Sequence, residues 1–503
     1  MSESLEAALA ARDGRSTALD DGTRTLNFGE LHAVLHAERE WLAAAAVQRC
    51  AIVADNGIPW VLADLALHLA GTPCIPLPGY FTVAQRRHAL DDAGVDAVLC
   101  DAPDLVLALS PDWRVAGKSP GSGLTLLRRP VFRLSDVSLP AGTTKITYTS
   151  GSTATAKGVC LGRGHLETVA ATLAEATREA AIERHLCVLP LATLLENVGG
   201  VYAPLLAGAR VMLPGLGTLG FSHGALDAGR LIRCIEECKP SSLILVPELL
   251  KVLVAAAERG WPVPASLRFV AVGGASVAPG LLQRAAAVGL PVFEGYGLSE
   301  CASVVCLNTP SARRPGSVGR ALPHVRVTLD AEGQILVSGP TMLGYLGDGR
   351  PNGSTTYATG DCGEIDAEGY VHVRGRLRNV FISSFGRNVS PEWVERELVQ
   401  DTRIAQALVS GEARPYPVAV LSPGPATGGP AGIAEAVASA NLRLPDYAQV
   451  RRWLVAPEPF SVANGLLTAN GRLRRARIMA EYGVRLEALY CAEPDYETIL
   501  EYA

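Results

Sequence analysis

Residues 145–161, KITYTSGSTATAKGVCL, constrain the chain more than any other segment. An apolar stretch ends in a run of hydroxyl and glycine residues, and a lysine and a second apolar stretch follow. Hydroxyls and free backbone N–H groups suit a polyphosphate, and a lysine adds a mobile positive charge. A Walker A loop needs Gly-Lys before Ser or Thr, whereas Lys157 precedes a glycine, so a P-loop NTPase is disfavoured. A plain Ser/Gly-rich surface loop remains the alternative.

Short apolar runs alternate with helical patterns through most of the chain. Residues 50–54, 242–246 and 269–272 are typical of strands, whereas residues 60–70 and 280–288 have the apolar spacing of helices. We further expect strands at 74–76, 97–99 and 291–293 and a helix at 82–93. Strands that alternate with helices indicate parallel βαβ units, so the predicted fold class is α/β.

The second half of the chain changes character. Residues 325–373 contain alternating strands joined by Gly and Asp turns, and a helix is then entered through Ser390, Pro391 and Glu392. Residues 415–432, rich in Pro and Gly, predict a strand with a loop. We therefore predict a large N-terminal domain of stacked βαβ subdomains and a small, mobile α+β C-terminal domain. Their expected ranges are 1–375, with a β-rich subdomain at about 316–375, and 376–503.

Composition excludes several classes of protein. The chain has 503 residues, 48% of them hydrophobic and 19% charged, which is typical of globular domains. A net charge of −5 gives no basic footprint for a nucleic acid. No apolar run approaches the roughly 20 residues of a membrane helix, and the polar start MSESLEAALAARDGR is unlike a secretory signal. We expect a cytoplasmic protein with no transmembrane segment and no nucleic-acid partner.

Cysteine spacing gives a further expectation. The eleven cysteines are scattered and form no C-x-x-C pair. This pattern predicts buried, reduced thiols and argues against zinc and disulfide frameworks.

Five further segments with recognisable motifs follow the phosphate-type loop along the chain. They are LPLATLLE (189–196), EGYGLSE (294–300), YATGD (357–361), GRLRNVFISSFGRNVSPEWVE (375–395) and LTANGRLRR (467–475). Together with YTSGSTATAKGV, they resemble the motifs of the adenylate-forming superfamily, which holds acyl-CoA synthetases, peptide-synthetase adenylation domains and firefly luciferase. The resemblance runs from about residue 25 to residue 478 and is nearest to the long-chain fatty acyl-CoA synthetases.

The resemblance implies an ATP-dependent reaction. A carboxylic acid would be activated to acyl-AMP with release of pyrophosphate, and the acyl group would then pass to a thiol. An amino acid substrate is disfavoured, because residues 186–195 lack the acid that peptide-synthetase domains use for an α-amino group. We expect an aliphatic or fatty acid, because EGYGLSE and FISSFGRNVSPEWVE are most similar to the fatty acid branch. The implied cofactors are ATP, Mg²⁺ and coenzyme A. Two alternatives stay open: an acyl-AMP ligase that loads the phosphopantetheine arm of an acyl carrier protein, and a non-catalytic nucleotide-binding paralogue.

The resemblance also implies roles for individual residues. Lys157, Glu300 and Arg472 would be catalytic, and Thr153 and Glu300 would hold Mg²⁺. The residues expected to contact ATP or AMP are Thr149, Ser150, Gly151, Ser152, Thr153, Lys157, Gly274, Ala275, Glu294, Gly295, Tyr296, Gly297, Leu298, Ser299, Asp361 and Arg376.

Two further positions concern the mobile domain, and three depart from the family pattern. Arg378 stands at the expected hinge, and Gly386 lies on the face expected to serve thiol transfer. Arg472 replaces the family's adenylation lysine, which keeps the positive charge but changes its geometry. Ala154 and Ala156 stand where the family usually has Gly and Pro.

Overall fold

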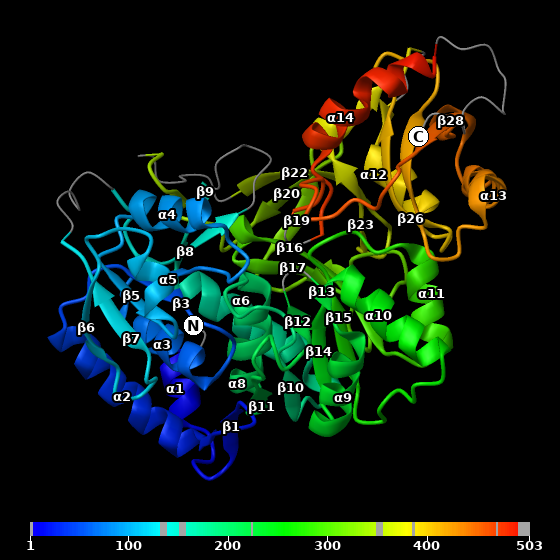
Figure 1. Ribbon diagram of the computed structural model, residues 1–503. Coiled ribbons are helices and arrows are strands. Elements are labelled where there is room, and N and C mark those ends of the chain that lie inside the picture. Colours follow the sequence, from blue (N-terminus) through cyan, green and yellow to red (C-terminus); the bar gives the residue numbers. More distant parts are fainter. Residues whose placement is uncertain are drawn as a thin grey trace.

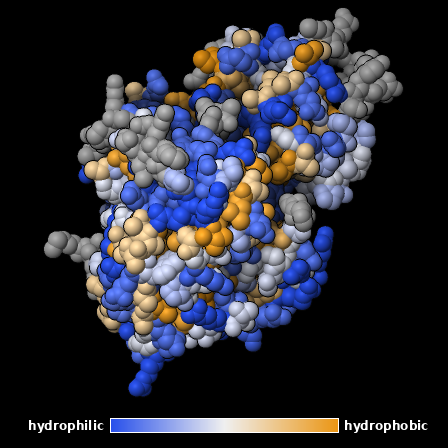
Figure 2. All heavy atoms as spheres, turned by 60° about the vertical axis from the view of Figure 1, so that its left-hand side comes forward, coloured by the Kyte–Doolittle hydropathy of each residue, from blue (hydrophilic) through white to orange (hydrophobic). Residues whose placement is uncertain are grey.

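The computed structural model confirms the predicted α/β class, with a large N-terminal part and a small C-terminal part (Figure 1). It describes residues 4–130, 138–149, 157–222, 225–348, 356–384, 388–468 and 471–490. Figure 2 shows mostly polar residues on one face, with smaller apolar patches between them. Within the described residues, none of the helices combines the length and apolar character needed to cross a bilayer.

An eight-stranded sheet carries the phosphate-type loop. Its central strands β8, β4, β3 and β5 run parallel, as the βαβ pattern predicts. In spatial order the strands are β21 (Gly344–Tyr345), β9 (Lys157–Gly162), β8 (Thr143–Thr149), β4 (Cys74–Pro76), β3 (Cys50–Val53), β5 (Ala97–Cys100), β7 (Thr125–Arg128) and β6 (Arg114–Lys118). The predicted strands at 50–54, 74–76 and 97–99 are thus confirmed to within one residue.

A nine-stranded sheet forms the other half of the large part. In spatial order its strands are β18 (Arg320–Ala321), β17 (Ser303–Leu307), β16 (Val292–Leu298), β15 (Phe269–Val272), β14 (Ser242–Leu245), β10 (Arg184–Leu186), β11 (Arg210–Met212), β1 (Thr17–Asp20) and β2 (Thr25–Asn27). The strand predicted at 291–293 is longer than expected, because β16 continues through EGYGL as an antiparallel partner of β17. A short hairpin, β12 (Phe221–Ser222) with β13 (Ala225–Leu226), lies apart from both sheets.

Helices fill the space between and around the two sheets (Figure 1). α3 (Ile58–Ala70) is buried along almost its whole surface, which explains its nearly unbroken apolar sequence. One core cluster joins residues of both sheets to α3, α6 and α8. The other helices are α1 (Leu5–Ala10), α2 (Phe28–Ala44), α4 (Val83–Asp92), α5 (Pro103–Leu107), α6 (Arg163–Ala176), α7 (Leu194–Glu196), the π-helix η3 (Asn197–Tyr202), α8 (Ala203–Ala207), α9 (Ala228–Cys238), α10 (Pro247–Glu258) and α11 (Pro279–Ala287).

A four-stranded antiparallel sheet follows, as the β-rich pattern predicts. It contains, in spatial order, β19 (Arg326–Leu329), β20 (Gln334–Ser338), β22 (Thr356–Ile365) and β23 (Val371–Arg376). In Figure 1 it lies between the two large sheets below and the C-terminal part above. The exact domain boundary at residue 375 stays a prediction.

The C-terminal part is built on a small three-stranded sheet. Its elements are β24 (Phe381–Ile382), β25 (Asn388–Val389), α12 (Pro391–Leu398), β26 (Ile404–Ser410), β27 (Val418–Pro423), α13 (Gly429–Asn441), β28 (Arg452–Val455) and α14 (Arg475–Ala488). α12 starts at Pro391, as expected. The loop predicted to end at residue 432 is wrong in its last part, because α13 begins at Gly429 and buries Ile433, Ala436 and Val437 on one face.

A buried ion pair ties the phosphate-loop strand to the core. Lys145 on β8 lies 2.7 Å from an oxygen of Asp64 on α3, and both side chains are 1% exposed. Asp64 also accepts hydrogen bonds from Asn197 (2.8 Å) and Tyr202 (2.7 Å), both on η3. A buried charge is tolerated only when it is paired and hydrogen-bonded, so this network fixes how β8 sits against two helices.

Candidate active site

The phosphate-type loop connects two strands of a hairpin. β8 and β9 pair antiparallel, and Thr149 lies opposite Lys157 at the open end. The ladder therefore holds together the two positions between which the loop begins and ends. Ser150, Gly151, Ser152 and Thr153 lie outside the described residues, as do Ala154 and Ala156, so the predicted magnesium ligand Thr153 stays a prediction.

Lys157 and Glu300, both predicted catalytic, share one aromatic neighbour. The Lys157 nitrogen lies 5.1 Å from the centre of the Tyr345 ring. The Tyr345 hydroxyl donates a 3.0 Å hydrogen bond to Glu300 Oε1 and lies 3.1 Å from the Tyr357 hydroxyl. Tyr345 reaches this place because β21 pairs with β9. Tyr345 could not be predicted from the sequence, since no short motif marks a two-residue strand.

A strained turn places Glu300. The residue belongs to the 3₁₀-helix η4 (Ser299–Cys301), which connects the antiparallel strands β16 and β17. Ala302 and Ser303 then adopt positive φ angles of 57° and 116°. Such conformations cost about 1–3 kcal/mol each in non-glycine residues and cluster at functional sites. A partly exposed carboxylate offers the hard oxygen ligand that Mg²⁺ prefers, so Glu300 fits its predicted role in chemistry.

The other predicted residues of the EGYGLSE motif lie along β16. Glu294, Gly295, Tyr296, Gly297 and Leu298 are strand residues, and Ser299 opens η4. Gly297 is required by space, because a Cβ atom there would lie 1.8 Å from the carbonyl oxygen of Ser303. The strand can therefore approach β17 closely only without a side chain at this position.

Asp361, predicted to bind ribose, is held by two side chains. Tyr296 donates a 2.6 Å hydrogen bond to Asp361 Oδ2, and Arg376 Nε lies 2.8 Å from Oδ1. Arg376 also donates to the Thr359 carbonyl oxygen at 3.2 Å. Burial raises the pKa of Asp361, whereas the charge of Arg376 lowers it. The structure thus brings together three predicted nucleotide contacts from β16, β22 and β23.

Glu294 is half-buried and has an altered acidity. Burial raises its pKa to about 7, although the charge of Arg396 on α12 opposes this shift. Arg396 donates a 3.2 Å hydrogen bond to Ser276, so a residue of the C-terminal part contacts the loop after β15. The predicted residues Gly274 and Ala275 are exposed in that loop, and Gly274 has a φ of 80°.

Arg472 reaches across from the C-terminal part. Its guanidinium donates a hydrogen bond to the carbonyl oxygen of Gly274. Desolvation and the neighbouring charge of Arg376 lower the pKa of Arg472, whereas Asp361 raises it, and part of the side chain stays in contact with solvent. An arginine stays charged in such surroundings, so a cation from the C-terminal part stands beside the predicted nucleotide residues.

The predicted hinge lies directly after β23. Arg378 is exposed in the 3₁₀-helix η5 (Leu377–Asn379). Gly375, just before it, approaches α12 so closely that a Cβ atom would lie 2.3 Å from Ser390 Oγ. Gly386, predicted for thiol transfer, lies outside the described residues.

Two models of AMP-binding enzymes match this chain. A model described as AMP-binding enzyme matches residues 6–346, and a model of the AMP-binding enzyme C-terminal domain matches residues 379–494. The two matches include both large sheets and most of the C-terminal part, whereas Asp361 and Arg376 lie between the matched ranges.

Individual relatives cover most of the chain. It is 25% identical to the long-chain-fatty-acid–CoA ligase FadD15 of Mycobacterium bovis, over 90% of this chain and 89% of that protein. It is 30% identical to a feruloyl-CoA synthase of an Amycolatopsis species, over 76% of this chain and 80% of that protein. The fold resembles the anthranilate CoA ligase AuaEII in complex with anthranoyl-AMP, with a TM-score of 0.77 and 17% identity over 95% of this chain and 97% of that chain.

Proposed function

Since this chain belongs to the AMP-binding enzyme family and is an AMP-forming acid–thiol ligase, we propose that it activates an aliphatic or fatty acid and transfers the acyl group to coenzyme A. The observation that carries the proposal is the contact of Arg472 with Gly274, beside Asp361 and Arg376. It joins a cation of the C-terminal part to the residues predicted to hold the nucleotide.

The first half-reaction builds negative charge at phosphorus. A carboxylate oxygen attacks the α-phosphorus of ATP, the bond to the bridging oxygen breaks, and pyrophosphate leaves with that electron pair. Lys157 and Arg472 supply positive charge around the phosphates, and Asp361 accepts hydrogen bonds from the ribose hydroxyls. Mg²⁺, held in part by Glu300, would neutralise phosphate charge.

The second half-reaction replaces AMP by a thiol. The thiol sulfur forms a bond to the acyl carbon, the carbon–oxygen bond to AMP breaks, and the thiol proton goes to solvent or to the departing phosphate. Arg472 contacts Gly274 beside the predicted nucleotide residues, and we expect the C-terminal part to move before thiol transfer. Rotation about Arg378 is the proposed movement.

The segment after β10 supports an apolar acid. Residues 186–195 contain no acidic side chain, and Glu196, the first one after them, is fully buried and directed at His185. It is therefore engaged away from any substrate amino group. The buried side chains of this segment are otherwise largely apolar, among them Leu189, Leu191 and Leu194.

A pyrophosphate-release assay tests the proposal. Purified enzyme is given ATP, Mg²⁺ and single acids from three classes: aliphatic acids of increasing chain length, aromatic acids and amino acids. Each reaction is run with and without coenzyme A, and thioester is measured separately. The proposal predicts that aliphatic acids give the fastest release of pyrophosphate and the fastest formation of thioester. Faster turnover of ferulate or anthranilate would change the acid class, and no release with any acid would refute the activity.

A further inference from the structure

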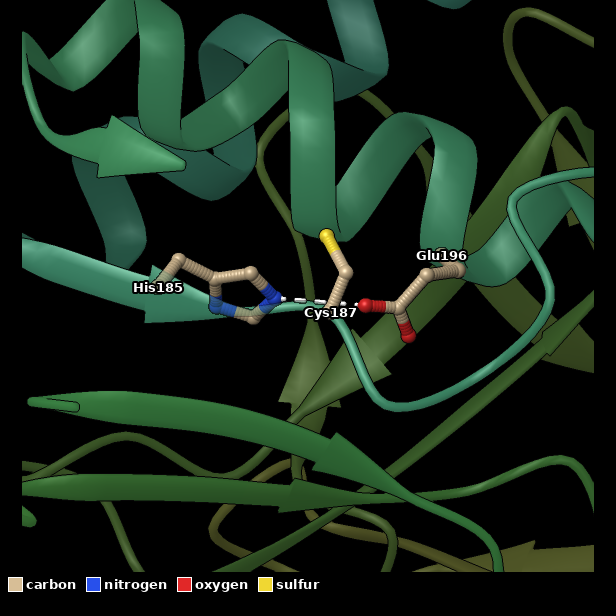
Figure 3. Close-up of side chains that lie close together, drawn as sticks. All are labelled: His185, Cys187 and Glu196. Carbon is tan, nitrogen blue, oxygen red and sulfur yellow. Dashed lines mark hydrogen bonds and ion pairs between the residues drawn. The ribbon is translucent and has the colours of Figure 1, made fainter. Parts of the chain in front are cut away.

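Three different polar side chains meet in the core where β10 faces α7 and η3. His185 is 2% exposed, and Cys187 and Glu196 have no exposed surface. One ligand atom from each residue lies within 4.8 Å of the other two. Figure 3 shows His185 and Glu196 facing each other, with Cys187 beside the line that joins them. The proposed ligase reaction uses none of these groups.

The histidine is held in the way that metal-binding histidines are held. Its Nδ1 atom lies 2.8 Å from the Ser242 hydroxyl on the neighbouring strand β14. This contact fixes the ring, so that Nε2 is directed at Glu196 Oε1. A partner on the far ring nitrogen is typical of histidines that bind metal ions.

The distance between His185 Nε2 and Glu196 Oε1 is closer to the distance between two ligands of one metal ion than to the length of a direct charge-assisted hydrogen bond. His185 Nε2 and Glu196 Oε1 lie 3.4 Å apart. A charge-assisted hydrogen bond is usually about 2.7–2.9 Å long. Two ligands bound to zinc at 2.0–2.1 Å in tetrahedral geometry lie about 3.3 Å apart. The observed spacing therefore matches two corners of a zinc site.

One further observation points to an occupant: Glu196 Oε2 is buried and accepts no hydrogen bond of normal geometry. Gly200, on η3, packs closely against the pair, and a Cβ atom there would lie 2.6 Å from Glu196 Oε1 and 2.8 Å from His185 Nε2. Gly200 does not have a positive φ, so its backbone conformation does not require glycine. The short distance to Glu196 and His185 does require it. π-Helical turns such as η3 occur often at functional sites.

We propose that His185, Cys187 and Glu196 bind one Zn²⁺ ion, with a water molecule as the fourth ligand. Nitrogen, thiolate sulfur and carboxylate oxygen are the ligands that zinc takes in proteins. A neutral imidazole, a thiolate and a carboxylate together balance the two charges of the ion, which a buried site requires. Burial and the charge of Glu196 raise the pKa of Cys187, so zinc must displace the thiol proton, which leaves to solvent.

The ion would add metal bonds between elements that are now joined by packing, by the contact of His185 with Glu196 and by a hydrogen bond from the Cys187 thiol to the Gly200 carbonyl oxygen. Cys187 directly follows β10, whereas Glu196 ends α7 and Gly200 belongs to η3. A zinc ion here stabilises the segment that leads from the nine-stranded sheet to the buried Asn197 and Tyr202. The absence of a C-x-x-C pair predicts that the chain has no zinc framework, but this criterion does not detect a mixed site with a single cysteine.

Metal analysis of the untagged, full-length enzyme tests the proposal. The enzyme is freed of metal with a chelator, given Zn²⁺, passed through a desalting column and analysed for bound zinc. A second sample is given Co²⁺ alone, and its absorption spectrum is recorded. We expect one retained zinc per chain, a thiolate-to-cobalt band in the near ultraviolet and visible bands of a four-coordinate ion. Zinc should also raise the unfolding temperature.

Matched cysteine variants locate the ion. Cys187→Ser should lose the thiolate-to-cobalt band, whereas Cys234→Ser should keep it. Cys234 is a suitable control because its sulfur lies 3.9 Å from that of Cys238, a competing pair of thiols. Wild-type enzyme that retains no zinc and gives no cobalt spectrum overturns the proposal whatever the variants do. A band that survives Cys187→Ser, or disappears with Cys234→Ser, also overturns it.

Discussion

The ammonium nitrogen of Lys157 lies 5.1 Å from the centre of the Tyr345 ring, and the hydroxyl of this tyrosine donates to Glu300. One side chain thus contacts both the cation at the end of the phosphate-type loop and the carboxylate predicted to hold magnesium. A cation over an aromatic face gains about 0.5–2 kcal/mol. The contact limits where the flexible lysine can lie before ATP binds.

Replacement of either charged residue should impair acid activation. Lys157→Ala and Glu300→Ala should each lower the rate of pyrophosphate release by about 10²-fold or more, as loss of one charge-stabilising group does elsewhere. Single-turnover assays with saturating ATP measure this rate. Lys118→Ala, on the exposed strand β6, is the matched control and should leave it unchanged. A fall of less than about threefold, under 1 kcal/mol, would mean that the roles are misassigned.

Tyr345→Phe should have a smaller effect of a different kind. The ring remains beside Lys157, but the hydrogen bond to Glu300 is lost, a change of about 1 kcal/mol or roughly fivefold. We expect the variant to need a higher Mg²⁺ concentration for half-maximal pyrophosphate release. A titration of Mg²⁺ measures this concentration. Tyr345→Leu, which also removes the ring, should be worse than Tyr345→Phe. Equal activity of the two variants would contradict a role for the ring.

The arginine at the family's lysine position should be functional. Arg472→Ala should lower acid activation by about 10²-fold or more, because it removes the cation that the C-terminal part brings to Gly274. Arg477→Ala, an exposed arginine on α14, serves as control. If the wild type is inactive and Arg472→Lys creates activity, the chain is a non-catalytic paralogue instead.

The half-buried carboxyl of Glu294 should make stability depend on pH. Its pKa of about 7 lies above its ordinary value of 4.5, so the folded state holds the proton more tightly than the unfolded state. Stability contributed by this group therefore falls as the pH rises from about 4.5 to 7. Relative to wild type, Glu294→Gln should gain up to about 3 kcal/mol across this window. Urea unfolding at pH 5 and pH 8 measures the gain, and Glu332→Gln in an exposed turn should show none.

The buried pair of Lys145 and Asp64 should be strongly coupled. Lys145→Met leaves the carboxylate buried without its cation and should destabilise the fold by about 3–5 kcal/mol. Adding Asp64→Leu should recover much of this loss, because no unpaired charge remains. Denaturant unfolding of the two single variants and the double variant gives the coupling energy. If the stability losses of the two single variants simply add up in the double variant, Lys145 and Asp64 are not energetically coupled.

Much of the fold could be predicted because its signals are local. The strands at 50–54 and 269–272 are short apolar runs between helical patterns, and each is a strand in the structure. The helix α13 was missed because the Pro and Gly that begin it are also typical of loops, while its buried face consists mostly of small residues. The local composition predicts a loop, whereas burial of one face against the rest of the C-terminal part stabilises the helix.

The residues of the candidate site also fall into two groups, those with a local sequence signal and those without one. Lys157, Glu300 and Asp361 belong to short motifs, and their positions could be read from the sequence. Tyr345 and the partnership of Lys145 with Asp64 could not, because each depends on segments that are far apart in the chain and meet only in the folded sheets. The strained backbone at Ala302 and Ser303 has no sequence signal either, since both residue types ordinarily avoid positive φ.

The glycine at position 297 has a consequence for anyone who wishes to redesign this enzyme. The carbonyl oxygen of Ser303 stands where its first side-chain carbon would be, so even alanine must push two strands apart. Libraries that randomise residues around the substrate can leave that codon untouched, because nearly every variant there will be lost to misfolding before its selectivity can be screened.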